Sequence, residues 1–252
     1  RSTGLSVDVV PEFAPDLALP IQSWDWIAFC IHSYSFREGS TTYVRFPHHI
    51  HGSPPCTTYG LAAFLYWRSV ESPAACDESP RLAHDADSAA LAFSLIVAVL
   101  RRFGLPTTFT MENPASSLIW RLPFLQHLFA ADCGDLRRVW ADYCMYGHRN
   151  RKPSCFATSR AIAHLFGKVC DMSGDCGAMT RQGFGFAHAG PDGGFNMLDA
   201  AIPAGLCFDI LEAVRRMHGP YIRDSSLYCT LTLERAEEMH GFWVAEYGRG
   251  HA

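Results

Sequence analysis

The sequence feature that most constrains the fold is an uninterrupted apolar segment, Ala89 to Leu100. Charges of opposite sign frame it, and a glycine and a proline follow: Asp85, Asp87, Arg101, Arg102, Gly104 and Pro106. Acids in the first turn, bases in the last turn and a Gly-Pro stop are typical of an α-helix. The segment has about half of the roughly 20 apolar residues that a membrane span needs. It therefore predicts the core helix of a soluble globular protein.

Composition and charge exclude several classes of protein. The 252 residues are 48% hydrophobic and 18% charged, which suffices for a sizeable core and excludes a disordered chain. The net charge of -4 excludes a protein that coats nucleic acid non-specifically, because such binding needs many Lys and Arg. The ten cysteines are scattered rather than framed at short repeated spacings, so we expect a reducing, intracellular location.

Strand-like and helical segments alternate in the middle of the chain. Strands are predicted over 107–111, 139–143 and 155–158, and a helix over 124–130. This alternation is typical of βαβ units, so the predicted fold class is α/β with a parallel sheet. Working residues of such sheets lie at the carboxyl ends of strands. Two segments are expected at such ends: Pro54-Pro55-Cys56 and Glu112-Asn113-Pro114.

The N-terminal residues predict a short buried strand that ends at Asp8, before the proline at position 11. No start signal precedes this strand, so we expect complete relatives to have a further N-terminal segment. Residues 24–47 are rich in aromatic side chains without a clean period, and we expect a helix and then a loop there.

Glycines are dense from Cys170 to Phe195 and periodicity vanishes, which predicts an irregular insertion. After Pro203 we expect an amphipathic helix to about 217, a strand near 228–233 and a helix near 234–247. The chain is therefore expected to have three parts: a core over 1–160, an insertion over 161–200, and C-terminal helices that complete the core over 201–252.

Cys56 and Glu112 are candidates for chemistry. Cys56 lies on a loop that two prolines make rigid, with Thr57-Thr58 beside it, and such a loop presents a thiol as a nucleophile requires. Glu112 follows apolar residues and precedes a tight turn, so its carboxylate is expected to point into the same crevice. The alternatives are a small buried hydrophobic residue and a surface carboxylate. If both residues serve chemistry, Cys56 and Glu112 are expected to line one cleft.

Basic residues without an acid occupy the segment between Tyr143 and Cys170: Arg149, Arg151, Lys152, Arg160 and Lys168. A solvated charged face is the ordinary explanation. A contact to phosphate or to a base is the sharper one, because Arg offers bidentate donors to both.

Cys170, Cys176 and His188 are candidate zinc ligands, with His164 as a fourth. Their spacings do not match the compact Cys-x2-Cys pairs of structural zinc sites. A glycine-rich loop with incidental thiols is therefore favoured, and no metal site is predicted.

Three motifs follow one another in the chain: Pro54-Pro55-Cys56-Thr57-Thr58-Tyr59-Gly60, then Glu112-Asn113-Pro114, then Asp142-Tyr143-Cys144-Met145-Tyr146-Gly147 with Arg151-Lys152-Pro153-Ser154. In order and separation they resemble the cytosine-5 DNA methyltransferase family. The resemblance is strongest to its divergent branch in phages, large viruses and algal or mobile-element sequences. It spans about Gly4 to Pro203.

The resemblance implies a Rossmann-like sheet and transfer of a methyl group from S-adenosylmethionine to C5 of cytosine in DNA. Cys56 then matches the nucleophile that adds to C6 of the cytosine, and Glu112 matches the glutamate that engages N3. Arg151, together with Arg149, matches the arginines that hold the base. A base stacked in a duplex cannot be reached, so base flipping is implied.

The resemblance also implies binding residues. Asp8 matches the acid that binds the ribose hydroxyls of the cofactor, and Pro54 lies beside the cofactor in the family. Asn113, Arg149 and Lys152 are expected to contact the DNA. The irregular insertion occupies the place of the target-recognition segment, and neither a membrane nor an obligate protein partner is expected.

The chain departs from the family pattern on the cofactor side. The glycine-rich first motif is not found, Pro20 stands where the family has an aspartate, and Gly60 stands where serine is usual. These departures imply weak binding of S-adenosylmethionine by this chain. Two alternatives remain: an inactive or truncated relative with the same fold, and a cysteine hydrolase that pairs Cys56 with His48, His49 or His51.

Overall fold

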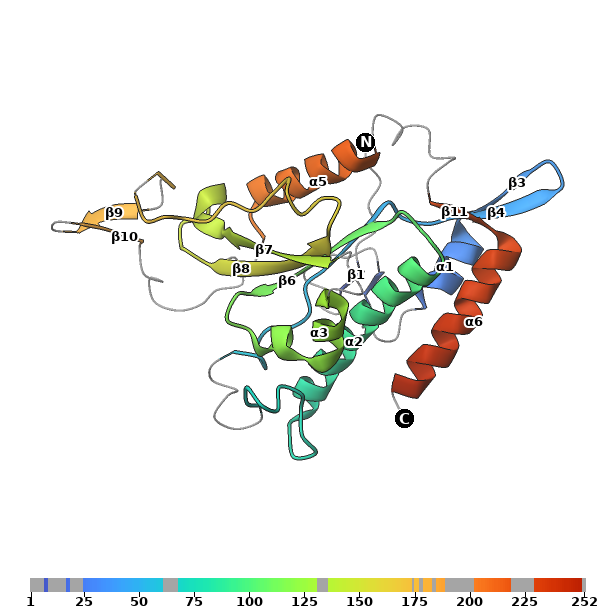
Figure 1. The fold of residues 1–252 in the computed structure, drawn as a ribbon, viewed down its shortest axis with the longest axis horizontal. Coiled ribbons are helices and arrows are strands. Elements are labelled where there is room, and N and C mark those ends of the chain that lie inside the picture. The colour runs from blue at the N-terminus through green and yellow to red at the C-terminus, as the bar shows by residue number, and fades with distance from the viewer. Residues whose placement is uncertain are drawn as a thin grey trace. The chain divides into compact units, whose positions relative to one another are not determined.

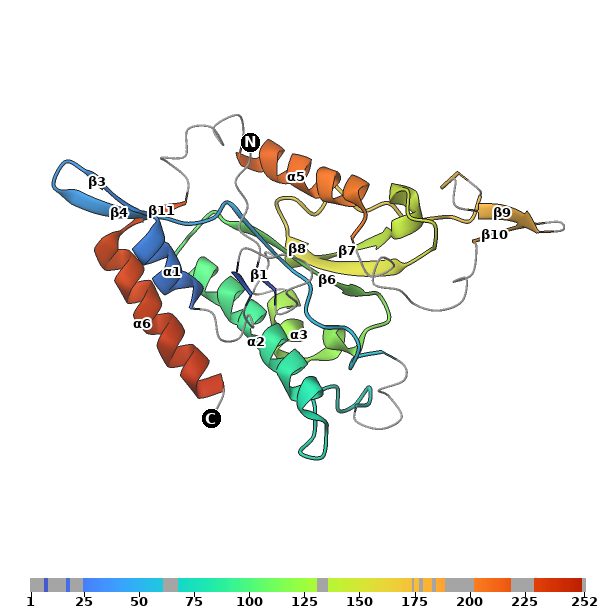
Figure 2. The same cartoon turned by 180° about the vertical axis from the view of Figure 1, so that it is seen from behind.

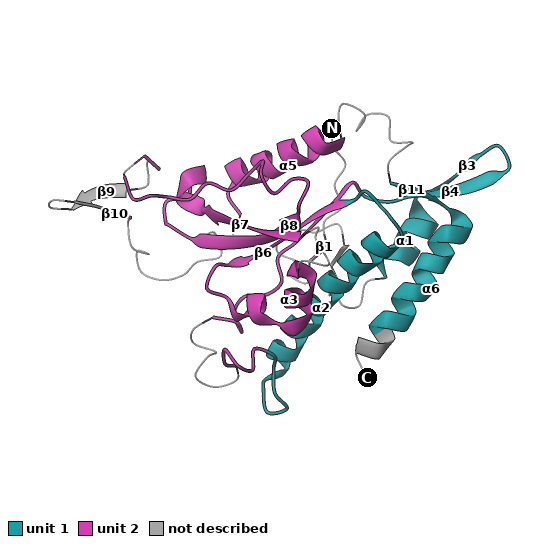
Figure 3. Cartoon of the chain, viewed as in Figure 1, with its two compact units in different colours: residues 1–47, 74–107, 225–252 teal, residues 48–73, 108–224 magenta. Residues whose placement is uncertain are grey.

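The computed structural model describes residues 7–8, 17–18, 25–60, 68–130, 136–173, 175–176, 179–182, 185–188, 202–218 and 229–250 (Figures 1 and 2). For 7–8, 17–18, 179–182, 185–187 and 248–250 only the backbone is described. The chain divides into two compact units, one of residues 1–47, 74–107 and 225–252 and one of residues 48–73 and 108–224 (Figure 3). The expected core over 1–160 thus contributes to both units.

The first unit combines three described helices with short strands. The helices are α1 (Trp26–Ser33), α2 (Arg81–Arg102) and α6 (Leu233–Gly250), and α6 contacts both others. Strands β3 (Ser35–Glu38), β4 (Thr41–Arg45) and β11 (Thr230–Thr232) form an antiparallel sheet of order β11-β4-β3. Strands β1 (Val7–Asp8) and β2 (Leu17–Ala18) form a parallel pair.

Helix α2 confirms the helix predicted from the apolar segment. It begins at Arg81, so the prediction that Asp85 and Asp87 lie in its first turn is wrong. Within the described ranges it is the one helix long and apolar enough to cross a membrane, by length and composition. More than half of its most apolar window, 56%, is buried inside the protein. This burial is what the core helix of a globular unit requires.

The loop expected after α1 is a β-hairpin, so that prediction is wrong. Phe36 and Tyr43 face each other across β3 and β4, and their rings stack with centroids 5.7 Å apart. Gly39 has φ +60°, a left-handed conformation that suits the two-residue turn it forms with Ser40. The signal in the sequence was this glycine, which lies between two short segments that each contain an aromatic residue, Phe36 and Tyr43.

The second unit is organised on a four-stranded sheet of order β5-β6-β8-β7. Its strands are β5 (His49–Gly52), β6 (Thr108–Pro114), β7 (Leu136–Asp142) and β8 (Pro153–Ser159). β5 is parallel to β6, whereas β8 is antiparallel to both β6 and β7. The side chains of β6 are buried from Thr108 to Asn113, so this strand is covered on both faces.

The α/β class is confirmed, but the sheet is not parallel throughout. Residues 143–152 are all that join β7 to β8, and a parallel connection needs about a dozen residues or more. β8 therefore returns antiparallel. The carboxyl ends of β5, β6 and β7 meet at the same edge as the start of β8, and we call this edge the strand-end edge.

Helices cover both sides of this sheet (Figures 1 and 2). Helix α5 (Ala204–His218) packs Leu206, Ile210 and Val214 into a core cluster with Phe156 of β8. On the other side lies α3 (Pro123–Phe129), which follows the 3-10 turn η4 (Leu118–Arg121). A second 3-10 turn, η6 (Tyr143–Tyr146), follows β7 directly.

The glycine-rich segment contains a hairpin, β9 (Met179–Gln182) with β10 (Gly185–His188). The prediction of irregular structure is therefore wrong over these residues. Dense glycine lowers strand propensity, but glycine is also typical of the turns that join short antiparallel strands. Within this segment, residues 174, 177–178, 183–184 and 189–195 lie outside the described residues.

A glycine at position 167 allows the chain after β8 to lie against β7. Gly167 has φ +102°, and a Cβ there would lie 2.3 Å from Cγ1 of Val139. The backbone N–H of Asp142 donates to the carbonyl of Lys168 at 2.9 Å. A side chain at position 167 would therefore push this segment away from β7.

Alanine substitutions separate backbone strain from this steric contact. Gly147 has φ +85° with open space around its Cβ position, so Gly147→Ala should cost about 1–2 kcal/mol of unfolding free energy. Gly167→Ala adds a clash, which costs about 1–3 kcal/mol more. Urea denaturation of both variants measures the difference. Equal losses would contradict the close approach at Gly167.

Candidate functional site

The loop that carries Cys56 is joined to β6 at the strand-end edge. The Nδ2 atom of Asn113 donates to the carbonyl of Pro54 at 2.8 Å, and both residues are buried. Beyond them, the backbone N–H of Leu118 donates to the carbonyl of Tyr59 at 3.1 Å. The two motifs that the sequence placed at strand ends therefore adjoin in the structure.

Glu112 is the centre of the polar contacts at this edge, although its side chain is nearly buried. Its Oε1 atom accepts hydrogen bonds from the Tyr143 hydroxyl at 2.9 Å and the Ser154 hydroxyl at 2.7 Å. The ammonium of Lys152 lies 3.8 Å from the same oxygen and 4.7 Å from the centroid of the Tyr143 ring. Groups from β6, from the end of β7 and from the start of β8 thus converge on one carboxylate.

The half-buried thiol of Cys56 belongs to the same electrostatic environment. Burial raises the pKa of Cys56, the positive charge of Lys152 lowers it, and the negative charge of Glu112 raises it. The net effect is a raised pKa, so the thiol is mostly protonated at neutral pH in the free protein. Cys56 and Glu112 therefore interact electrostatically, and the cleft that they are expected to line stays a prediction.

One polar atom at the edge has no partner among the described residues. Asn113 is 1% exposed, and its Oδ1 atom accepts no hydrogen bond in the part of the chain that the structure describes. A buried acceptor of this kind is costly unless a ligand or a water molecule satisfies it. It marks the edge as a place for a hydrogen-bond donor.

Of the two neighbouring basic residues, Lys152 lies close to Glu112 and Arg151 does not. The Nη2 atom of Arg151 lies 3.2 Å from Oδ2 of Asp142, and its Nη1 atom lies 3.6 Å from the sulfur of Met172. The expected role of Arg151 at the base therefore has no contact with Glu112 to support it. Arg149 is exposed.

The residues expected to bind the cofactor, Asp8 and Pro54, line neither of two cavities in the described part of the chain. Asp8 lies in β1, of which only the backbone is described. One cavity of about 310 Å³ and one of about 90 Å³ contain neither Cys56 nor Pro54. Their lining residues are Gln126, Phe129, Leu136, Arg137 and Arg138 in the first and Leu165, Asp209, Glu212, Ala213 and Arg216 in the second. The S-adenosylmethionine site that the resemblance implies therefore stays a prediction.

The three histidines before Cys56 are bonded elsewhere. A ring nitrogen of His49 lies 3.0 Å from the Thr108 hydroxyl, and one of His51 lies 2.6 Å from the Thr110 hydroxyl. The ring of His48 packs against α5. Within the described ranges, no hydrogen bond joins any of these rings to the thiol, which disfavours a Cys-His hydrolase.

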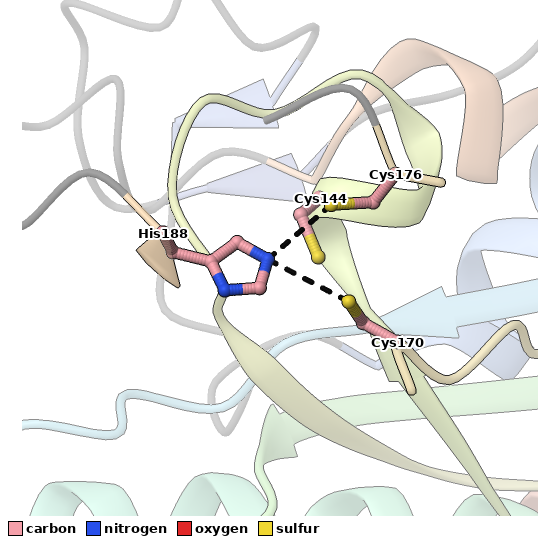
Figure 4. Close-up of side chains that lie close together, drawn as sticks. All are labelled: Cys144, Cys170, Cys176 and His188. Atoms are coloured by element: carbon pink, nitrogen blue, oxygen red, sulfur yellow. Dashed lines mark hydrogen bonds between the residues drawn. The ribbon is translucent and has the colours of Figure 1, made fainter. Parts of the chain in front are cut away.

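A second cluster of reactive side chains includes neither Glu112 nor its partners Tyr143, Ser154 and Lys152. The ligand atoms of Cys144, Cys170, Cys176 and His188 all lie within 4.8 Å of one another (Figure 4). His164, the fourth ligand considered from the sequence, is exposed and outside the cluster. Cys144 belongs to the cluster instead, and its position inside the Tyr-Cys-x-Tyr-Gly motif concealed this from the sequence analysis.

The thiols of this cluster interact strongly. The pKa of Cys144 is raised to about 12, first by burial and then by the neighbouring thiols of Cys170 and Cys176.

Comparisons of the chain with protein-family models, with curated proteins and with solved structures give no match. The function is therefore inferred from the geometry of the site and from the sequence motifs.

The charges around Cys56 predict opposite effects of two substitutions. Lys152→Met should raise the pKa of Cys56 and slow its alkylation by iodoacetamide several-fold at neutral pH, because a favourable charge is lost. Glu112→Gln should lower this pKa and speed the alkylation. Peptide mass spectrometry gives the rates, with exposed Cys207 as the internal reference and Arg149→Met as the control. Effects of the same sign in both variants would contradict the arrangement.

Proposed function

We propose that the second unit carries the cytosine-activating site of a DNA cytosine-5 methyltransferase. One observation carries this proposal: a thiol and a buried carboxylate, Cys56 and Glu112, adjoin at the ends of two neighbouring parallel strands, and the charge of Lys152 acts on both. Ligands of open α/β sheets bind outside the carboxyl ends of strands. The motif order supports the same function.

The chemistry of cytosine explains why these groups are needed together. C5 is a poor nucleophile until a thiolate adds to C6, which forms a C–S bond and moves an electron pair toward C5 and N3. A carboxyl group at N3 stabilises the electron-rich ring through a hydrogen bond. The departure of the C5 proton to a base, after a group has added to C5, lets the thiolate leave.

Each residue at the edge has a part in this scheme. Cys56 supplies the thiolate, and Lys152 lowers the cost of forming it. Tyr143 and Ser154 hold one oxygen of Glu112, which fixes the plane of the carboxylate before the base arrives. Asn113 holds the loop of Cys56 against β6 through its hydrogen bond to the carbonyl of Pro54.

The resemblance implies S-adenosylmethionine, which supplies the methyl group when it is bound. The proposal for the described residues concerns the activation of cytosine. An inactive relative with the same fold is the alternative that the experiment below distinguishes.

Hydrogen exchange at C5 tests the covalent step without a methyl donor. After the thiolate has added to C6, C5 takes a deuteron from D2O, and loss of the C5 proton and departure of the thiolate leave deuterium in the base. We expect exchange into cytosine of DNA, measured by mass spectrometry of the released nucleosides. Cys56→Ser and Glu112→Gln should abolish it, and Cys207→Ser should leave it unchanged.

Two outcomes would overturn the proposal. Exchange that persists in Cys56→Ser would show that this thiol is not the nucleophile. No exchange by a folded protein that binds DNA would favour the inactive relative.

The two basic residues Arg149 and Lys152 should affect DNA binding differently. Arg149 is exposed, so Arg149→Ala should weaken binding to all duplexes and reduce the slope of log affinity against log salt by about one. Lys152 is 18% exposed and faces Glu112, so Lys152→Met should abolish the C5 exchange with a smaller change in slope. Fluorescence anisotropy over a salt series, together with the exchange assay, measures both. Equal slopes and equal exchange in the two variants would contradict this division.

A further inference from the structure

Four side chains that lie far apart in the sequence converge at one point of the second unit (Figure 4). Cys144 comes from η6, Cys170 and Cys176 from the segment that follows β8, and His188 from the end of β10. We propose that Cys144, Cys170, Cys176 and His188 bind one structural zinc ion. This inference does not depend on the proposed function.

The distances between the donor atoms suit a tetrahedral zinc ion. Zn–S bonds of about 2.3 Å and Zn–N bonds of about 2.0–2.1 Å, at the tetrahedral angle, separate sulfur from nitrogen by about 3.6 Å. The Nε2 atom of His188 lies 3.6 Å from the sulfur of Cys170 and 3.3 Å from that of Cys176. Donor atoms that all lie within 4.8 Å of one another enclose room for a single ion.

The donor set selects zinc and a structural role. Three thiolates and one imidazole are a common ligand set of structural zinc, whereas Ca²⁺ and Mg²⁺ require oxygen ligands. Four protein ligands leave no position for a substrate. Cys144 and Cys170 are buried, which also closes the site to solvent from their side.

The backbone around the cluster holds the donors in place. The backbone N–H of Cys170 donates to Oδ2 of Asp142 at 2.8 Å. The Tyr146 hydroxyl accepts from the backbone N–H groups of Gly167 at 3.0 Å and of Lys168 at 2.9 Å. These bonds attach the segment before Cys170 to the turn that carries Cys144.

The hairpin brings the last donor back to the others. In the antiparallel pair of β9 and β10, His188 lies opposite Met179, which follows Cys176 closely in the chain. The long spacing between Cys176 and His188 is thereby closed by strand pairing. This explains why the spacing in the sequence did not look like a zinc motif.

The local charge also suits the ion. Zn²⁺ with three thiolates and a neutral imidazole carries a net charge of 2 − 3 = −1. The guanidinium of Arg151, held by Asp142, acts electrostatically on the thiols of Cys144 and Cys170 and offsets part of this charge. The basic residue beside the motif thus has a role that does not involve DNA.

The consequence of the ion is to hold a segment that has little core of its own. The described side chains from Lys168 to Cys176 are exposed or half-buried except for Cys170. Apolar burial therefore stabilises this segment little, and metal ligation can supply the missing free energy.

The experiment is a measurement of metal content with ligand and control variants. The full chain is purified under reducing conditions, with any affinity tag removed, and zinc is counted by inductively coupled plasma mass spectrometry. We expect about one zinc ion per chain, as a four-ligand site requires. Cys176→Ser and His188→Ala, at half-buried positions, should reduce the zinc to background, and so should Cys144→Ser.

Matched controls make the assignment specific. His188→Cys should retain the ion, because a fourth thiolate also ligates zinc. His164→Ala, Cys207→Ser and Cys56→Ser should leave the zinc content unchanged. In protein reconstituted with Co²⁺, the visible bands of tetrahedral cobalt and a thiolate-to-cobalt charge-transfer band should appear, and Cys176→Ser should abolish them.

Several results would overturn the proposal. Reduced, folded protein that takes up no zinc in equilibrium dialysis would do so, as would zinc retained in Cys176→Ser and His188→Ala. A disulfide between two of the three thiols in freshly purified protein, seen as the loss of two hydrogens in the intact mass, would point to a redox pair instead. Loss of zinc in His164→Ala would restore the ligand considered from the sequence.

Discussion

The hydrogen bonds to the buried carboxylate of Glu112 are the interaction on which the strand-end edge depends. A carboxylate that is 5% exposed requires donors, and the hydroxyls of Tyr143 and Ser154 provide them, while the ammonium of Lys152 adds an ion pair at 3.8 Å. Because these donors come from the end of β7 and the start of β8, one side chain of β6 fixes three strands at the same edge. The antiparallel direction of β8 brings Ser154 and Lys152 within reach of Glu112.

The two sites share this edge through the end of β7. Asp142 forms an ion pair with Arg151 and accepts a hydrogen bond from the backbone of Cys170. Tyr143, which follows Asp142, donates to Glu112, and Cys144 belongs to the thiol cluster. Three consecutive residues thus serve an ion pair, a buried carboxylate and a candidate metal centre. A short 3-10 turn can do this because it turns consecutive side chains in different directions.

The sequence predicted what depends on local pattern. The apolar segment and the C-terminal signals of α2 are local, and so is the pattern of β6, although α2 has no acid in its first turn. That the loop of Cys56 lies beside β6 follows from the rule of strand ends. The direction of β8 and the hairpins β3–β4 and β9–β10 depend on turns of few residues, which composition obscures. Two outcomes depend on where the chain lies after β7 and β8: Lys152, not Arg151, contacts Glu112, and Cys144, not His164, joins the thiol cluster. No pattern in the sequence encodes either outcome.

The interleaving of the two units has a consequence for biosynthesis. The segment of residues 74–107 lies between the two stretches that make up the second unit, and the first unit is completed only by residues 225–252. During synthesis, the sheet of the second unit can therefore pair before the ribosome has released the strand and helix that close the first. The N-terminal helix α1 must wait for α6, its partner from the far end of the chain. Such a chain depends on chaperones more than one whose units follow in sequence, because apolar surface stays exposed until residues 225–252 have been synthesised.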